Sequence, residues 1–314
     1  SGGRNFFDGW SKPDTSRAQQ WNPKEQYFAN LSYTYNFKND LQLLYTGSFF
    51  NETITNRGEP RVNATAFDDY YKTLRTGHNL TLKGRIFENH YVEQIVAYNF
   101  FQRKKNRYVK DLVTLEEVLT AAQSDHDTSR FDHYLARGWI SRDRQDKVFN
   151  YQLGYDINVE MGFGDRIASD DNSIGDYAVF GSFRIQPLPN FTIQPGVRWS
   201  YNTKYNAPVT PSLHLKGKVG KWVTLRGTYA RGFRAPSLKE LYFLFVDVNH
   251  NIQGNQELKA EKSHNVTFTA TYRQLVNNKH GISVEPQLFF NHIEDQITLA
   301  QVDVEELLYS YVNV

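Results

Sequence analysis

Apolar side chains recur at every second position along most of this chain, and this alternation restricts what the chain can fold into. One row of alternate residues contains Tyr27, Ala29, Leu31, Tyr33, Tyr35 and Phe37. Further rows contain Leu41, Leu43, Tyr45 and Gly47, and then His78, Leu80, Leu82, Gly84 and Ile86. Because successive side chains of a strand point to opposite faces, each row predicts a β-strand with one apolar face.

The alternation predicts about thirteen strands, each near the roughly 9–11 residues that a tilted strand needs to cross a membrane. After strands near 27–37, 41–47, 78–86 and 92–100, we expect strands near 132–140, 147–160, 176–186, 190–201, 209–217, 221–231, 262–273, 281–292 and 306–314. Short connections (38–40, 87–90, 141–147, 187–190, 216–221 and 274–281) alternate with longer ones (52–75, 103–131, 161–175, 202–208, 232–261 and 293–305). Bacterial outer-membrane barrels have short periplasmic turns and long extracellular loops, so we predict an all-β, antiparallel transmembrane β-barrel.

The composition is compatible with such a barrel and excludes several other classes. Aromatic residues make up 15% of the chain, which argues against disorder. The mean hydropathy is −0.62, and no apolar run reaches the roughly 18 residues of a membrane-spanning helix. The absence of cysteine excludes disulfides and thiolate chemistry. A net charge of +2 does not indicate nucleic acid as a partner.

One segment departs from the period of two. Residues 111–123 carry apolar side chains at helical spacing, namely Leu112, Leu115, Val118, Leu119 and Ala122. We expect a short helix in an external loop that covers the barrel mouth, with contact to a ligand as the alternative.

Two short motifs lie between 227 and 262. The first is Phe233-Arg234-Ala235-Pro236, and the second is Gly254-Asn255-Gln256-Glu257-Leu258-Lys259-Ala260-Glu261. They resemble the FRAP box and the GNPDLKPE-like box of TonB-dependent receptors, with Gln256 and Ala260 in place of two prolines. The specific resemblance covers about 146–314, and the earlier residues match only in their strand rhythm.

Both boxes also have a physical interpretation. Pro236 cannot donate to a sheet ladder, so it ends a strand at the rim, and Gly254-Asn255 supplies turn chemistry where the next strand begins. Arg231, Arg234 and Tyr242 are candidate substrate-binding residues near this rim. The alternative for the arginines is structural pairing with acids such as Glu240, Glu257 or Glu261.

The resemblance implies a receptor larger than this chain. Barrels of this class have 22 strands and a plugged lumen, so thirteen strands indicate a partial barrel over 1–314, or one piece of a split barrel. We expect the plug domain and the final strands to lie outside the chain. The implied partners are outer-membrane lipid of a Gram-negative bacterium and the TonB energy-transducing complex, reached through the plug, with a surface lipoprotein as a further candidate.

The resemblance also implies active uptake of a bulky nutrient, with an iron chelate such as a ferric siderophore or haem favoured. Haem receptors of the family carry a histidine between the two boxes, and His250 lies there. A neutral imidazole is a suitable axial ligand for haem iron, so His250 is the candidate if haem is the cargo. We expect no resident cofactor and no resident metal.

Three other functions remain open from the residues. A passive porin would show the same strand rhythm, and a soluble β-rich binding or adhesion module would also be rich in strands. An outer-membrane enzyme would need a convergent set of catalytic groups, which we do not find. The loop acids at 68–69 and 170–171, and the Asp125-His126-Asp127 cluster as a metal ligand, are weak candidates, so we predict that the protein is not an enzyme.

Overall fold

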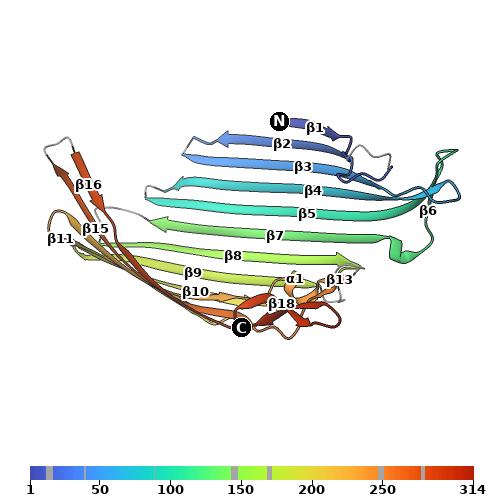
Figure 1. The fold of residues 1–314 in the computed structure, drawn as a ribbon. Helices are drawn as coiled ribbons and strands as arrows, with labels where there is room; N and C mark the ends of the chain where they lie inside the picture. The colour runs from blue at the N-terminus through green and yellow to red at the C-terminus, as the bar shows by residue number, and fades with distance from the viewer. Residues whose placement is uncertain are drawn as a thin grey trace.

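The structure is a computed structural model that describes residues 1–11, 17–38, 40–87, 89–142, 148–167, 172–246, 251–276 and 280–314. One antiparallel sheet of fifteen strands dominates it, and thirteen of these strands follow one another along the path of the sheet (Figure 1). In path order they are β1 (Gly2–Phe7), β2 (Lys24–Asn36), β3 (Leu41–Arg57), β4 (Thr65–Ile86), β5 (His90–Asp111), β7 (Asp127–Arg142), β8 (Phe149–Gly164), β9 (Ser173–Leu188), β10 (Phe191–Asn202), β11 (Thr210–Val219), β12 (Val223–Arg234), β15 (Glu261–Val276) and β16 (His280–Val284). The predicted all-β antiparallel architecture is therefore confirmed.

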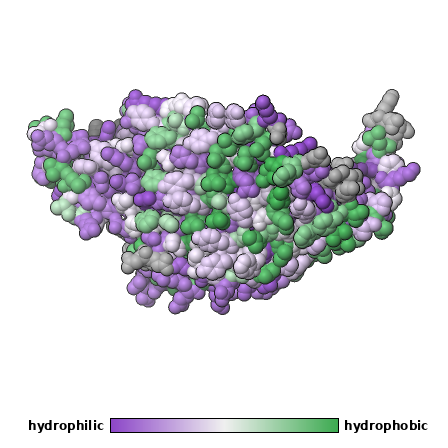
Figure 2. All heavy atoms as spheres, turned by 180° about the vertical axis from the view of Figure 1, so that it is seen from behind, coloured by the Kyte–Doolittle hydropathy of each residue, from purple (hydrophilic) through white to green (hydrophobic). Residues whose placement is uncertain are grey.

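The register of the sheet gives it one apolar and one polar face. One cross-strand row from β2 to β10 consists of Tyr33, Tyr45, Leu80, Val96, Ala136, Ile157, Tyr177 and Tyr201. The adjacent row, on the opposite face, consists of Ser32, Thr46, Asn79, Ala97, Leu135, Asn158, Asp176 and Asn202. On the apolar face, hydrophobic residues gather over the middle of the strands (Figure 2).

The two ends of the sheet differ in their connections, as predicted. Short turns join β2 to β3, β4 to β5, β9 to β10 and β11 to β12 at one end, which we call the turn end (Figure 1). Asp40, Phe87 and Gly220 adopt positive φ in these turns, with values of 57°, 53° and 63°. The longer connections lie at the opposite end, which we call the rim.

Several strands run further toward the rim than the sequence predicted. The expected loop at 52–75 is mostly strand, because β3 continues to Arg57 and β4 starts at Thr65. β4 and β5 each contain 22 residues. Backbone pairing continues beyond the apolar band, where both faces of the strands carry polar side chains, so the alternation ends before the strand does. β1 was not predicted.

The helix expected at 111–123 is absent, and that prediction was wrong. The segment forms a turn, then β6 (Glu117–Leu119), which pairs with β5, and a short 3₁₀ helix, η1 (Gln123–Asp125). The carboxylate of Asp111 accepts hydrogen bonds from the backbone of Val113 and Thr114 at 2.7 and 2.9 Å, and Leu115 has a φ of 64°. An Asx-type turn competes with helix, and the apolar residues at 113, 115 and 118 are at least 65% exposed, so no packing favours a helix.

The last predicted strands also differ. The strand expected at 281–292 is divided into β16 and β17 (Gln287–Glu294), both paired with β15, because Pro286 cannot donate to the ladder. The strand expected at 306–314 lies outside the main sheet. It is β19 (Leu308–Asn313) in a separate sheet with β13 (Leu244–Val246), β14 (Asn251–Gln253) and β18 (Ile297–Asp303).

The main sheet is open within the described part of the chain. Its path begins at β1 and ends on β15 with β16 and β17, and β1 has no pairing to either of these last two strands among the described residues. None of the described helices is long and apolar enough to cross a membrane.

Candidate functional site at the rim

The two sequence boxes meet where β12 ends and β15 begins. Arg234, the last residue of β12, lies opposite Glu261, the first residue of β15. Its Nε and Nη2 donate to the two carboxylate oxygens of Glu261 at 2.8 and 2.6 Å. Its Nη1 donates to Glu240 at 2.9 Å. One guanidinium therefore ties the end of one strand, the start of the next and the helix between them.

The electrostatics of this cluster keep both acids ionised. Burial alone would raise the pKa of Glu240, but hydrogen bonds from Arg234 and Ser237 outweigh burial and lower it. The hydrogen bonds from Arg234 lower the pKa of Glu261, whereas its burial opposes this shift. The two carboxylates in turn raise the pKa of Arg234 above its ordinary value. At neutral pH the cluster holds two negative charges and one positive charge.

The residues after Pro236 form a small hydrophobic core. α1 (Leu238–Tyr242) begins with a capping box, in which Ser237 accepts from the backbone of Glu240 and the Glu240 side chain accepts from the backbone of Ser237. The apolar residues of the helix then pack with others from β9 and the loop before it, the second box and β18. This cluster comprises Ile167, Ile174, Leu238, Leu241, Tyr242, Leu258 and Ile297.

The second box closes this core from the other side. Asn255 donates from its backbone to the carbonyl of Glu240 at 2.9 Å and from its side chain to the carbonyl of Tyr311 at 3.0 Å. A Cβ added at Gly254 would come within 2.6 Å of the backbone of Leu241. Only glycine fits that close approach without a shift of α1, which explains the Gly-Asn pair physically.

The separate four-stranded sheet packs against the same box. β14 pairs with β19 in parallel, so the end of the chain lies beside the loop that follows α1. The side chain of Asn313 accepts from the backbone of Lys259 at 2.8 Å and donates to the carbonyls of Lys259 and Asp295 at 3.1 and 2.7 Å. Neither Asn313 nor Ser237 was singled out from the sequence. The Ser-x-x-Glu spacing at 237–240 is the signal that indicates the capping box.

The structure separates the predicted site residues. Arg234 lies in the ion-pair cluster, and Tyr242 is only 7% exposed in the core. Arg231 lies on the apolar face of β12, in the same row of alternate residues as Tyr229 and Phe233. His250 lies outside the described residues. The roles of these four residues in ligand binding stay predictions.

The remaining candidates from the sequence also have partners at the rim. Asp68 pairs with Arg17 at 2.5 Å, and Asp69 pairs with Arg107 at 2.8 Å. Asp125 also pairs with Arg107, at 3.0 Å. His126 contacts the carbonyl of Thr120 at 2.9 Å, and Asp127 pairs with Arg166. These contacts assign Asp125, His126 and Asp127 to separate local interactions. The pair 170–171 lies outside the described residues.

The polar face forms a wall with two kinds of hollow. One, of about 700 Å³, is lined mainly by neutral hydrogen-bonding side chains, including Asn30, Ser32, Thr46, Ser48, Asn79 and Asn99. Another, of about 720 Å³ near the turn end, includes the basic side chains Arg184, His214, Lys216, Lys218 and Arg226. Between them, Asp156 pairs with Arg137 and Arg198 at 2.7 and 3.2 Å.

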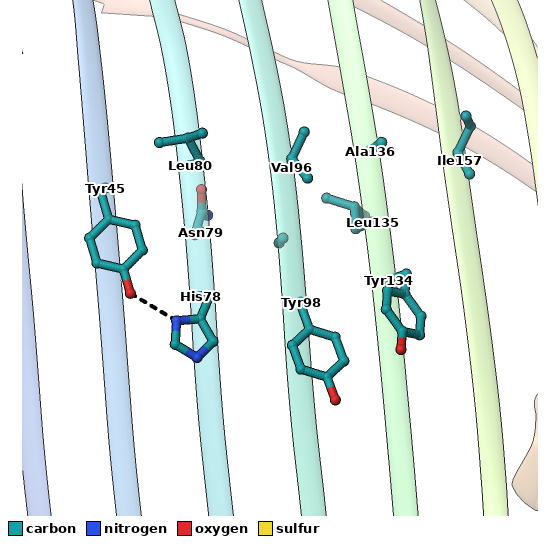
Figure 3. A pocket seen from close by; sticks show the side chains of 11 residues that line it. Tyr45, His78, Asn79, Leu80, Val96, Tyr98, Tyr134, Leu135, Ala136 and Ile157 are labelled. Carbon is teal, nitrogen blue, oxygen red and sulfur yellow. Dashed lines mark hydrogen bonds between the residues drawn. The ribbon is translucent and has the colours of Figure 1, made fainter.

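The apolar face carries a smaller groove, of about 320 Å³, bordered by aromatic rings. Tyr45, His78, Tyr98 and Tyr134 border it on the rim side, and Leu80, Val96 and Ile157 border it on the side of the turn end (Figure 3). Its lining is almost wholly apolar, which is typical of a surface that contacts lipid rather than a water-soluble ligand.

A comparison with protein families identifies the family to which this open antiparallel sheet belongs. The model of the TonB dependent receptor-like β-barrel matches residues 1–314. The chain belongs to this family. TonB-dependent receptors are outer-membrane β-barrels that act as receptors and transporters, so the apolar face is the side expected to meet lipid and the polar face the side expected to line the lumen.

Two curated relatives of this TonB-dependent receptor chain are named for siderophores. The Ferric enterobactin receptor of Pseudomonas aeruginosa is 27% identical over 149 residues, which are 44% of this chain and 20% of the relative. The protein named Probable TonB-dependent siderophore receptor PirA, of Acinetobacter baumannii, is 25% identical over 169 residues, which are 47% of this chain and 22% of the relative. The match thus covers about a fifth of each relative.

Solved structures of a siderophore receptor and of a hemophore receptor share the fold. The siderophore receptor PirA of Pseudomonas aeruginosa superposes with a TM-score of 0.59 at 16% identity, over 93% of this chain and 57% of that one. A double mutant of the Serratia marcescens hemophore receptor HasR, in complex with its hemophore HasA and heme, gives 0.61 at 12% identity, over 93% of this chain and 50% of that one. At these identities the likeness shows the fold alone.

Proposed function

We propose that this chain forms the wall of an outer-membrane receptor that imports an iron chelate, most specifically a ferric siderophore. The observation that carries the proposal is the 27% identity over 149 residues to a protein named Ferric enterobactin receptor. Uptake draws its energy from the TonB complex, which acts through a plug domain. A surface lipoprotein is a further candidate partner.

The geometry of the wall suits an anionic cargo. Lys216, Lys218 and Arg226 line a hollow of the polar face near the turn end, and no acid is among its described lining residues. Arg137 and Arg198, further along this face, are instead paired with Asp156 and Asp176. A surface region that is mainly of one sign raises the local concentration of oppositely charged ligands. Ferric complexes of catecholate siderophores carry negative charge, so this hollow favours their passage over that of a cation.

The rim cluster has a supporting role in this proposal. Arg234 uses all three of its nitrogens on Glu240 and Glu261, and Tyr242 is buried. Both residues hold the loop that follows the first box in a defined shape. Direct contact between the cargo and Arg231, Arg234 or Tyr242 stays a prediction, and the ion pairs favour a structural role for Arg234.

A binding titration tests the siderophore assignment. Full-length receptor in detergent is titrated with ferric enterobactin while tryptophan fluorescence is followed, and the iron-free siderophore serves as the control. Saturable quenching by the ferric complex at micromolar concentration or below is expected. Equal quenching by iron-free and ferric forms, or none by either, contradicts the proposal.

Haem is the second candidate cargo, and His250 is the observation that favours it. The same receptor is titrated with hemin, beside a His250→Ala variant, and the Soret band is followed. Tight binding that the substitution weakens makes haem the cargo. Hemin binding that is absent or indifferent to His250 contradicts haem as the cargo and leaves the ferric siderophore as the proposed one.

A further inference from the structure

Two tyrosine–histidine pairs mark the depth at which the apolar face becomes polar. The hydroxyl of Tyr45 lies 2.8 Å from Nδ1 of His78, and the hydroxyl of Tyr229 lies 3.0 Å from Nδ1 of His264. Both ring pairs are stacked at 27°. In each case the histidine lies two residues nearer the rim than the residue opposite the tyrosine.

This arrangement is typical of a membrane interface, where an aromatic ring faces hydrocarbon and its polar tip faces water. The hydroxyl groups of Tyr45, Tyr98 and Tyr134 all point toward the rim (Figure 3). The hydroxyl of Tyr98 donates to Asp132 at 2.6 Å on that side. The two pairs therefore indicate the outer boundary of the lipid-facing band at two places on the sheet.

Basic side chains gather around the histidine of the second pair and in the next row toward the rim. Arg231, His264 and His292 lie opposite one another in a single cross-strand row over β12, β15 and β17. The next row toward the rim contains Lys262 between Phe233 and Glu294. These two rows contain one acidic residue, Glu294, whose carboxylate oxygen lies 3.6 Å from Nε2 of His292. We call Arg231, Lys262, His264 and His292 the outer basic patch.

The cations of this patch are short of partners. The Nε atom of Arg231 is buried without a hydrogen-bond partner in the described chain. Neither Arg231 nor Lys262 forms an ion pair with any described acid. Near the first tyrosine–histidine pair the situation differs, because Arg130 is paired with Asp132 at 2.7 Å. A partly buried cation without a partner is costly, and an anion that reaches it is bound correspondingly well.

We propose that the outer basic patch binds the phosphate group of an outer-leaflet lipid whose acyl chains lie along Tyr229, Val266 and Phe290. A guanidinium binds phosphate with two parallel hydrogen bonds, and Lys262 adds a second charge. The patch lies at the boundary of the apolar band, which is the depth of a lipid headgroup. The inference rests on the membrane placement in the proposed function and is independent of the imported cargo.

The test uses the full-length receptor in nanodiscs of phosphatidylcholine. Bisphosphorylated lipid A is titrated as the probe, and bound lipid is counted by native mass spectrometry. The double variant Arg231→Gln and Lys262→Gln is expected to weaken lipid A binding about tenfold or more, since it removes both unpaired charges. The matched control, Lys72→Gln and Lys104→Gln, removes two charges from the same face further toward the rim and leaves binding unchanged.

Other outcomes overturn the proposal. Equal affinity of the receptor for lipid A and for its dephosphorylated form would show that the phosphate is not the recognised group. An equal loss of lipid A binding in the control variant would show that the binding depends on general surface charge and not on the outer basic patch. If millimolar inorganic phosphate displaces lipid A completely, the patch is a site for a free anion and not for a lipid. Arg231→Lys, which keeps the charge, is expected to retain part of the binding, and heat-modifiable gel mobility verifies that each variant is folded.

Discussion

Arg234 at the end of β12 and Glu261 at the start of β15 face each other across the strand pair and form a two-point ion pair, with nitrogen–oxygen distances of 2.6 and 2.8 Å. The same guanidinium reaches Glu240, within the connection between these strands, at 2.9 Å. The connection from β12 to β15 therefore starts and ends on one cluster, which fixes both of its ends at the rim.

Loss of this cluster should loosen the rim without unfolding the sheet. Arg234→Ala leaves two mostly buried carboxylates unpaired, which costs about 1–3 kcal/mol locally. We expect faster protease cleavage within 235–260 and unchanged gel mobility of the folded barrel. Arg85→Ala, an exposed arginine at the turn end of β4, is the matched control. Equal cleavage rates in both variants would show that the cluster does not hold the loop.

The rim should also respond to acid. Because the pKa values of Glu240 and Glu261 are lowered in the folded protein, their contribution to stability is present above the ordinary value of 4.5 and is lost as the pH falls below it. Protease resistance of 235–260 should be constant from neutral pH down to 4.5 and decline below. An acid-stable protease measures this. The variant with Glu240→Gln and Glu261→Gln should lose the pH dependence, and a persisting decline would assign it to other groups.

Gly254 should tolerate no side chain. In Gly254→Ala the new Cβ would lie 2.6 Å from the backbone of Leu241, so α1 must shift. Gly227→Ala on β12 is the control, since a Cβ there meets nothing within 4 Å. Hydrogen exchange at 238–242 should rise in the first variant alone. Unchanged exchange in Gly254→Ala would contradict the close approach.

The two faces of β4 should differ in their tolerance of charge. Leu80 lies on the apolar face and its neighbour Asn79 on the polar face. An arginine at a lipid-facing position costs about 2–4 kcal/mol at the bilayer midplane and about 0–1 kcal/mol at the interface, whereas lumen positions accept charge. Leu80 lies opposite Tyr45, just inside the outer boundary, so we expect a cost between these values. Leu80→Arg should therefore refold less completely into vesicles than Asn79→Arg. If Asn79→Arg refolded less completely than Leu80→Arg, the polar face would be the one that meets lipid and the apolar face the one that lines the lumen.

The sequence predicted the parts of this fold that depend on burial in lipid. Alternating residues such as Leu80 and Asn79 indicate strands because the two faces meet different surroundings. Beyond the apolar band this contrast disappears, so the length of β4 and β5 was underestimated. The helix at 111–123 was predicted from the spacing of apolar residues alone. The turn in which the Asp111 carboxylate accepts hydrogen bonds from the backbone of Val113 and Thr114 forms in its place.

The rim site was predictable only in part. Pro236 and Gly254 identified where strands end and begin, and Glu240 and Glu261 were named as partners for the arginines. The contact of Asn313 with the second box joins residues 54 positions apart, and no local pattern encodes it. The opposite faces of Arg231 and Arg234 follow from their odd separation along β12, which the sequence already contained.

The most direct test of the transport function is uptake of radioiron as a ferric siderophore by cells whose only receptor for it is the full-length protein. We predict accumulation that requires both the receptor and TonB and that ceases when either is deleted. Accumulation that persists without TonB would indicate a passive pore, and no accumulation of any ferric siderophore offered would contradict the assignment of the cargo.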